Sequence, residues 1–216
     1  MLFRLLTSLV FPHYCPSCGH EWFDGVGFIC SECWKRLEAF KGYRRIKEHE
    51  LKERTQIAFV YNEIARLLVL HMKFYGRIDI AEKLGSVLFQ QFYPQLSQIK
   101  FEAVIPVPLH SVRVRERGFN QSAVMASRLA DKLKAPLRDD LLHRTRNTRP
   151  QSRLSNQERE NNVIGAFAAR PPVNRIPGGT VLLVDDVLHT GSTVKGCVKV
   201  LEDIGIEDIR IMAAMG

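Results

Sequence analysis

The fold of this 216-residue chain is indicated most clearly by Val181-Leu-Leu-Val-Asp-Asp-Val-Leu-His-Thr-Gly-Ser-Thr193. The four apolar residues at its start predict a strand buried on both faces, as in a parallel sheet that is covered by helices. After Thr193, apolar residues recur at helical spacing from Val194 to Ile204, and Gly205 ends the pattern. A strand, a loop of small residues and a helix, in this order, predict an α/β domain.

The loop between this strand and this helix has the composition of a phosphate site. Gly191 allows the backbone to approach a ligand closely, and the free N–H groups at a helix start attract anions. The hydroxyl groups of Thr190, Ser192 and Thr193 can donate hydrogen bonds to the same phosphate oxygens. An ordinary capped turn would explain the glycine and the serine, but it would not explain the acidic pair before them.

That acidic pair, Asp185 and Asp186, stands where the strand ends. Adjacent carboxylates at a buried strand end repel each other, whereas a carboxylate can accept hydrogen bonds from the hydroxyls of a sugar. A phosphate beside a diol indicates a 5-phosphorylated ribose. The segment is similar to the ribose-phosphate motif of type I phosphoribosyltransferases, which implies phosphoribosyl pyrophosphate as ligand, with Mg²⁺ at one acid. The expected ligand-binding residues are Asp185, Asp186, Val187, Leu188, His189, Thr190, Gly191, Ser192 and Thr193.

A second anion site is predicted around an arginine-rich segment. We expect a strand over residues 101–105 that ends at two prolines, then a loop that presents three arginines, then a helix from about Asn120. Arginines at a strand end, followed by a helix start, suit the pyrophosphate, although a solvated basic loop is the alternative. Lys73 fits a phosphate contact and a surface position equally well. The expected pyrophosphate ligands are Arg113, Arg115, Arg117 and Lys73.

Residues 143–159 are rich in arginine and poor in apolar residues, and Pro150 lies in their middle. This composition predicts a mobile flap rather than part of the core. Basic flaps close over phosphates or hold single-stranded nucleic acid. The expected nucleic-acid contacts are Arg144, Arg146, Arg149 and Arg153.

Four of the five cysteines form two Cys-x-x-Cys pairs near the N-terminus. Four thiolates in two such pairs can close around one Zn²⁺ as a zinc ribbon or knuckle, and four protein ligands make the metal structural rather than catalytic. Two disulfides are the alternative, but nothing indicates export to an oxidising compartment. The fifth cysteine, Cys197, falls on the apolar side of the predicted helix. The expected metal ligands are Cys15, Cys18, Cys30 and Cys33.

Composition and local pattern set the domain organisation. The chain is 45% apolar with a net charge of +8, which favours a polyanionic partner, and it has no apolar run that could span a membrane. Residues 1–11 read as an amphipathic helix rather than a signal peptide. We therefore expect a cytoplasmic protein with a zinc lobe over residues 1–48 and an α/β domain over residues 49–216. A strand is expected over Thr55–Tyr61 and another over Ile209–Met215. Helices are expected after Asn62 and over Ile78–Phe92, the second ending at Pro94.

Several blocks, in this order, resemble the ComF family of bacterial competence proteins, including its GntX-like members. These are the paired Cys-x-x-Cys head, Ile105-Pro-Val-Pro-Leu109, Arg117-Gly-Phe-Asn-Gln121, Arg159-Glu-Asn-Asn-Val163 and Leu183-Val-Asp-Asp-Val187 with Thr190-Gly-Ser-Thr193. The resemblance implies a small zinc-binding lobe on a type I phosphoribosyltransferase fold, with a parallel sheet flanked by helices. It also implies the handling of single-stranded DNA during natural transformation, and a competence helicase as a partner of the lobe.

The residues leave two functions open. One is a transformation factor that binds single-stranded DNA and phosphoribosyl pyrophosphate. The other is an active phosphoribosyltransferase that acts on a small nucleophile, with Asp185 and Asp186 as the candidate catalytic residues. No stretch clearly stacks on a nucleobase and reads its edge, so the sequence does not predict turnover. A scaffold that keeps the fold and binds nothing tightly is a third alternative.

Overall fold

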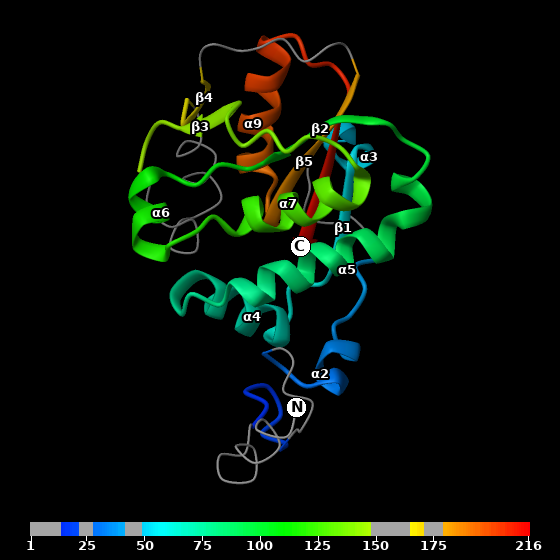
Figure 1. The fold of residues 1–216 in the computed structure, drawn as a ribbon, viewed down its shortest axis with the longest axis vertical. Helices are drawn as coiled ribbons and strands as arrows, with labels where there is room; N and C mark the ends of the chain where they lie inside the picture. The colour runs from blue at the N-terminus through cyan, green and yellow to red at the C-terminus, as the bar shows by residue number, and fades with distance from the viewer. Residues whose placement is uncertain (1–13, 22–27, 42–48, 148–164, 171–178) are drawn as a thin grey trace.

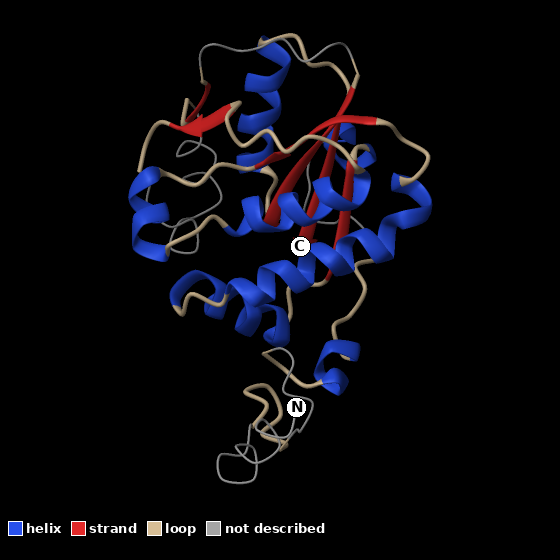
Figure 2. Cartoon of the chain, viewed as in Figure 1, coloured by secondary structure: helices blue, strands red, loops and turns tan. Residues whose placement is uncertain are grey.

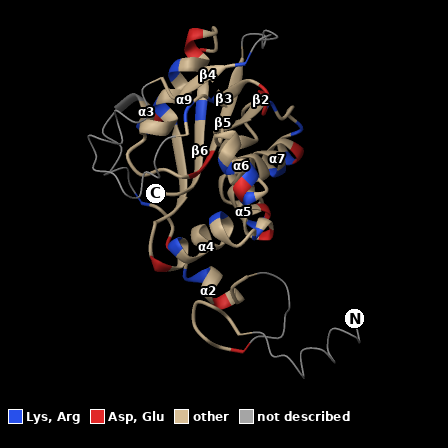
Figure 3. Cartoon of the chain, turned by 90° about the vertical axis from the view of Figure 1, so that its left-hand side faces the viewer, with Lys and Arg blue, Asp and Glu red and all other residues tan. Residues whose placement is uncertain are grey.

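The computed structural model describes residues 14–21, 28–41, 49–147, 165–170 and 179–216 (Figure 1). The expected helix over residues 1–11 and most of the expected flap lie outside these ranges. None of the described helices has the length and apolar composition that crossing a bilayer requires. Figure 3 shows that lysines and arginines are spread over several elements, α2, α4 and α6 among them.

A parallel sheet of four strands forms the centre of the molecule, in the order β1-β6-β5-β2 (Figure 2). The expected α/β architecture is therefore confirmed. The central strand β5 carries the acidic pair at its carboxyl end, where parallel sheets commonly bind ligands. The strands are β1 (Thr55–Phe59), β2 (Phe101–Pro106), β5 (Thr180–Val187) and β6 (Ile209–Met215).

The two faces of the sheet are covered by different elements, because side chains alternate along each strand. Leu182 and Val184 of β5 join an apolar cluster with α4, α5 and α7, and Val181 and Leu183 join another with α9. A two-stranded antiparallel ribbon, β3 and β4, lies on the α9 side. The bounds are α4 (Glu63–Phe74), α5 (Ile78–Leu96), α7 (Gln121–Leu133), α9 (Ser192–Asp203), β3 (Leu142–Arg144) and β4 (Phe167–Ala169).

Helix α5 continues past the point where the sequence predicts its end. Pro94 lies inside the helix, which runs to Leu96, so the expected termination at Pro94 is wrong. A proline in the last turn removes a backbone hydrogen bond, but continuing the helix buries Leu96, of which only 2% remains exposed. At the start of α4 the expectation is confirmed, because the Asn62 side chain accepts a hydrogen bond of 3.0 Å from the Ala65 N–H.

The arginine-rich segment after β2 is a helix, α6 (Ser111–Arg117), where the sequence analysis expects a loop. His110 caps its start by accepting a hydrogen bond of 3.3 Å from the Val112 N–H through Nδ1. Gly118 ends it in the left-handed conformation, at φ +84°, which costs glycine little. The expected helix from Asn120 is confirmed as α7, with Asn120 as its N-cap.

The cysteine-rich lobe contains the short helix α2 (Ser31–Lys35) and packs on the domain through its own apolar residues. Phe28, Ile29 and Leu37 belong to the same cluster as α4 and α5. The chain then pairs with the edge of β1, where the Phe40 N–H donates to the Ala58 carbonyl over 2.9 Å. Helix α3 (His49–Glu53) precedes β1, and the predicted division at residue 48 stays a prediction.

Candidate functional site

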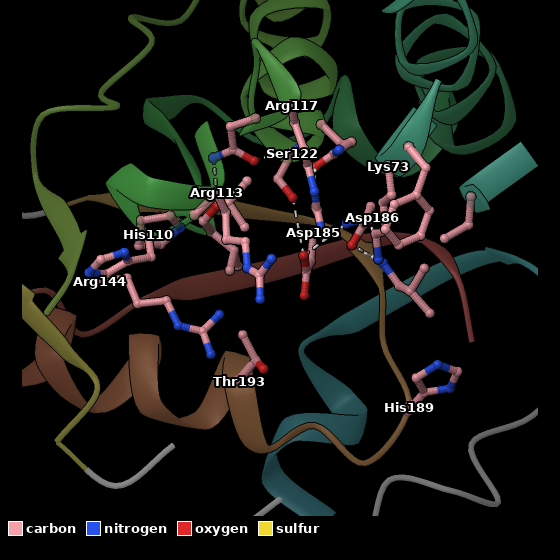
Figure 4. Close-up of a pocket in the computed structure, with 18 of the residues that line it drawn as sticks. Lys73, His110, Arg113, Arg117, Ser122, Arg144, Asp185, Asp186, His189 and Thr193 are labelled. Carbon is pink, nitrogen blue, oxygen red and sulfur yellow. Dashed lines mark hydrogen bonds and ion pairs between the residues drawn. The ribbon is translucent and has the colours of Figure 1, made fainter. Parts of the chain in front are cut away.

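A cavity of about 270 Å³ opens at the carboxyl end of β5 (Figure 4). Its wall combines the acidic pair with the start of α9, the helix α6, the start of α7 and the last turn of α4. Figure 4 shows the side chains of Arg113 and Arg144 pointing into the space between Asp185 and Thr193. The charged residues in the wall are Lys73, Arg113, Arg117, Arg144, Asp185 and Asp186.

Asp185 is held in place by two hydrogen bonds to the same carboxylate oxygen. The Ser122 hydroxyl donates to Oδ1 over 3.1 Å, and the Asp186 N–H donates to it over 2.9 Å. Burial raises the pKa of the Asp185 carboxyl to about 7, and the negative charge of Asp186 adds to this effect. A group with this pKa can take up or release a proton near neutral pH.

Asp186 forms an ion pair with Lys73. The Lys73 Nζ lies 2.9 Å from Asp186 Oδ2, and the Val187 N–H donates to Asp186 Oδ1 over 2.9 Å. Lys73 lies in the last turn of α4, so this ion pair connects α4 to the end of β5. The structure therefore places Lys73 inside the site rather than on an uninvolved surface.

The loop after the acidic pair turns sharply into α9. Gly191 adopts φ +84° directly before the first helical residue, Ser192. The hydroxyls of Thr190 and Ser192 lie 2.8 Å apart, and Thr193 faces the cavity. Of the nine residues expected to bind the ribose phosphate, five line the cavity, namely Asp185, Asp186, Val187, His189 and Thr193. Leu188 is instead buried in the core with α9.

The three expected pyrophosphate arginines separate because they lie on a helix. Arg113 and Arg117 are four residues apart, so they share one face of α6, and both line the cavity. Arg115 is exposed and lines a different depression. Burial lowers the pKa of Arg117, whose Nη1 donates to Gln121 Oε1 over 3.3 Å.

Arg144, expected to contact nucleic acid, also lies in the cavity wall. Its guanidinium carbon is 5.3 Å from the centre of the Phe167 ring, and burial lowers its pKa. Arg146 is exposed. Arg149 and Arg153 lie outside the described residues.

Sequence reasoning missed several polar residues of the wall. Gln121 and Ser122 enter from the first turn of α7, where Asn120 is the N-cap. Asn120 also donates a hydrogen bond of 3.0 Å to the Val107 carbonyl, which fixes the start of α7 against the end of β2. The helix-start signal at Asn120 could have marked this turn as a site. The missed polar residues are Tyr61, His110, Asn120, Gln121, Ser122 and Asn147.

The four N-terminal cysteines lie close enough to share one metal ion. Their sulfur atoms are all within 4.8 Å of one another, and Cys15 and Cys33, like Cys18 and Cys30, are 3.8 Å apart. A tetrahedron with metal–sulfur bonds of about 2.3 Å has edges of roughly 3.8 Å. Burial raises the pKa of Cys15, but hydrogen bonds from neighbouring groups outweigh it and lower this pKa to about 6. The donor set therefore fits a metal such as zinc.

Known proteins are similar to this chain over one domain and over most of its length. Residues 120–216 match the model of the phosphoribosyl transferase domain. Competence protein F of Haemophilus influenzae is 30% identical over 92% of this chain and 82% of its own length. DNA utilization protein YhgH of Salmonella typhi is 32% identical over 91% of this chain and 81% of its own length. Competence protein ComFC of Bacillus subtilis is 27% identical over 89% of this chain and 73% of its own length. The similarity thus extends beyond the matched domain to most of the chain.

Proposed function

The chain belongs to the ComF family of competence proteins, and from this we propose that it binds phosphoribosyl pyrophosphate, or a related ribose 5-phosphate, in the cavity at the end of β5. The ligand would enter as a magnesium complex. The protein would also bind single-stranded DNA in the cytoplasm during DNA uptake. A Zn²⁺ ion held by the four cysteines would stabilise the lobe, to which a helicase-like motor would bind.

The proposal is carried by one observation: two buried carboxylates and four cationic side chains share a single cavity with the start of a helix. Asp185 and Asp186 can accept hydrogen bonds from the ribose hydroxyls, and one of them can also meet Mg²⁺. The N–H groups at the start of α9 suit the 5-phosphate. Lys73, Arg113 and Arg117 can neutralise the pyrophosphate.

The ion pair between Lys73 and Asp186 has a consequence for this binding. Without ligand, Lys73 neutralises a carboxylate that is 9% exposed. A ribose hydroxyl or Mg²⁺ at Asp186 would release Lys73 toward the phosphate oxygens. The same lysine would therefore stabilise the acidic pair in the free protein and the pyrophosphate in the complex.

Titration calorimetry of phosphoribosyl pyrophosphate with Mg²⁺ tests the proposal. Replacing both acids, Asp185→Asn and Asp186→Asn, should weaken binding at least about tenfold, because charge-assisted hydrogen bonds contribute roughly 1.5–3 kcal/mol each. The matched control is Asp203→Asn, an exposed acid at the end of α9. Unchanged affinity in the double variant would exclude this cavity as the site.

Phosphoribosyl transfer is the second candidate, and one observation favours it. Phe74, on the cavity wall, is 70% exposed, although an aromatic ring gains by burial. An acceptor with a flat ring could cover it beside the ribose. Incubation of labelled phosphoribosyl pyrophosphate with cell extract would reveal such an acceptor as a ribosylated product. Catalysis would then depend on charge stabilisation and positioning.

A further inference from the structure

The cysteine lobe contacts α4 through the rings of Phe28 and His71, which are tilted by 38°. Phe28, two residues before Cys30, is buried, and its ring centre lies 4.2 Å from that of His71. His71 in turn stacks on Tyr75, one helical turn later, at 4.5 Å and an interplanar angle of 21°. We call Phe28, His71 and Tyr75 the aromatic column. It joins the lobe to the last turn of α4.

Arg77 closes the column from the other side of the break between α4 and α5. Its guanidinium carbon lies 4.8 Å from the centre of the Phe28 ring, within the range of a cation–π contact. Two hydrogen bonds of 2.8 and 2.6 Å to Asp79 fix the orientation of this guanidinium. Phe28 is therefore held by a helix end and by the start of the next helix.

The same turn of α4 carries a residue of the cavity. Lys73 lies between His71 and Tyr75 in sequence, and its Nζ meets Asp186 at 2.9 Å. The preceding carbonyl, that of Met72, accepts a hydrogen bond of 3.3 Å from Gln121 of α7. The turn is thus attached to the lobe through its rings and to the cavity through Lys73 and Met72.

We propose that the cysteine lobe positions Lys73 for ligand binding. The loop that carries Cys30 holds Phe28 against His71, and this contact fixes the last turn of α4 where Lys73 meets Asp186. The identity of the ligand rests on the proposed function, but the support of α4 by the lobe does not. Because coupling between two sites is reciprocal in binding free energy, phosphoribosyl pyrophosphate should also raise the affinity of the lobe for zinc, as measured by competition with a chelator.

A double-mutant cycle tests whether Phe28 acts through Lys73. In calorimetry with phosphoribosyl pyrophosphate and Mg²⁺, Phe28→Ala should weaken binding about fivefold, a coupling of ordinary size. In a Lys73→Met background, the same change should have no further effect. Glu32→Gln, a change of an exposed side chain in the lobe outside the aromatic column, should leave affinity unchanged. Equal losses in both backgrounds, or an equal loss in Glu32→Gln, would overturn the proposal.

Hydrogen exchange of the full-length protein without ligand provides a second measurement. Removing zinc with a chelator should speed the exchange of amides in residues 71–77 while those of α9 keep their protection. Unchanged exchange in residues 71–77 would overturn the positioning role, whatever the ligand. Faster exchange together with no binding of phosphoribosyl pyrophosphate would uphold the support of α4 and refute the proposed function alone.

Discussion

The carboxyl group of Asp185 lies between the Ser122 hydroxyl and the Asp186 backbone, and burial raises its pKa to about 7. In the unfolded chain an aspartate has a pKa of about 3.9. At a pH between these two pKa values, the carboxyl group is protonated in the folded protein and ionised in the unfolded chain. Folding stability contributed by this group therefore falls as the pH rises through this window.

Replacing Asp185 by asparagine should remove this part of the pH dependence. Between about pH 5.5 and about pH 8, the unfolding free energy of the wild type should fall by about 2 kcal/mol more than that of Asp185→Asn. Each pKa unit corresponds to about 1.4 kcal/mol. Urea denaturation at both pH values measures the difference. Asp203→Asn, exposed on α9, should show no such difference from the wild type. A parallel pH dependence of wild type and Asp185→Asn would mean that Asp185 titrates at its ordinary value.

The helical conformation of α6 leads to a prediction that a loop would not. Arg113 and Arg117 face the cavity and Arg115 does not, because residues two apart lie on opposite sides of a helix. In calorimetry with inorganic pyrophosphate and Mg²⁺, Arg117→Gln should therefore weaken binding about tenfold or more. Arg115→Gln, on the same helix and with the same charge change, should change affinity less than about twofold. Similar losses in the two variants would place the pyrophosphate elsewhere.

The elements that were predicted correctly have strong local signals. β5 contains the apolar run Val181–Val184, α4 and α7 begin at capping asparagines, and α9 follows Gly191. Helix α6 has weaker local signals, because its arginines alternate with other residues as in an extended segment and its N-cap is a histidine, His110, rather than Ser, Thr, Asp or Asn.

The candidate site could be predicted only in part. Asp185 and Asp186 were identified because they follow the strand directly in sequence. Ser122 contacts Asp185 from 63 residues away, and only the packing of α7 on the sheet brings them together. The inward position of Arg144 likewise depends on the pairing of β3 with β4, for which the sequence contains no local signal.

Among the described residues, several of the arginines and lysines fall into two groups, one in the cavity and one exposed. Four cations face the cavity, whereas Arg115, Arg146 and Arg170 are exposed. A small phosphorylated ligand would meet the first group, and a nucleic-acid chain would meet the second. The two kinds of binding can be separated by salt, since a chain that contacts many phosphates releases a counterion at each contact.

Replacing Arg146, Arg149 and Arg153 together by glutamine should weaken the binding of single-stranded DNA and flatten its dependence on salt. Each lost phosphate contact reduces the slope of log K against log salt by about 0.7, so three contacts predict a decrease of roughly 2 between about 50 and 200 mM salt. Fluorescence anisotropy with a labelled oligonucleotide measures this slope. The single change Arg146→Gln should leave the affinity for phosphoribosyl pyrophosphate unchanged, because Arg146 is exposed and does not line the cavity. If the slope instead stays at the wild-type value, the DNA surface lies elsewhere, and the exposed Arg115 and Arg170 would be the next residues to replace.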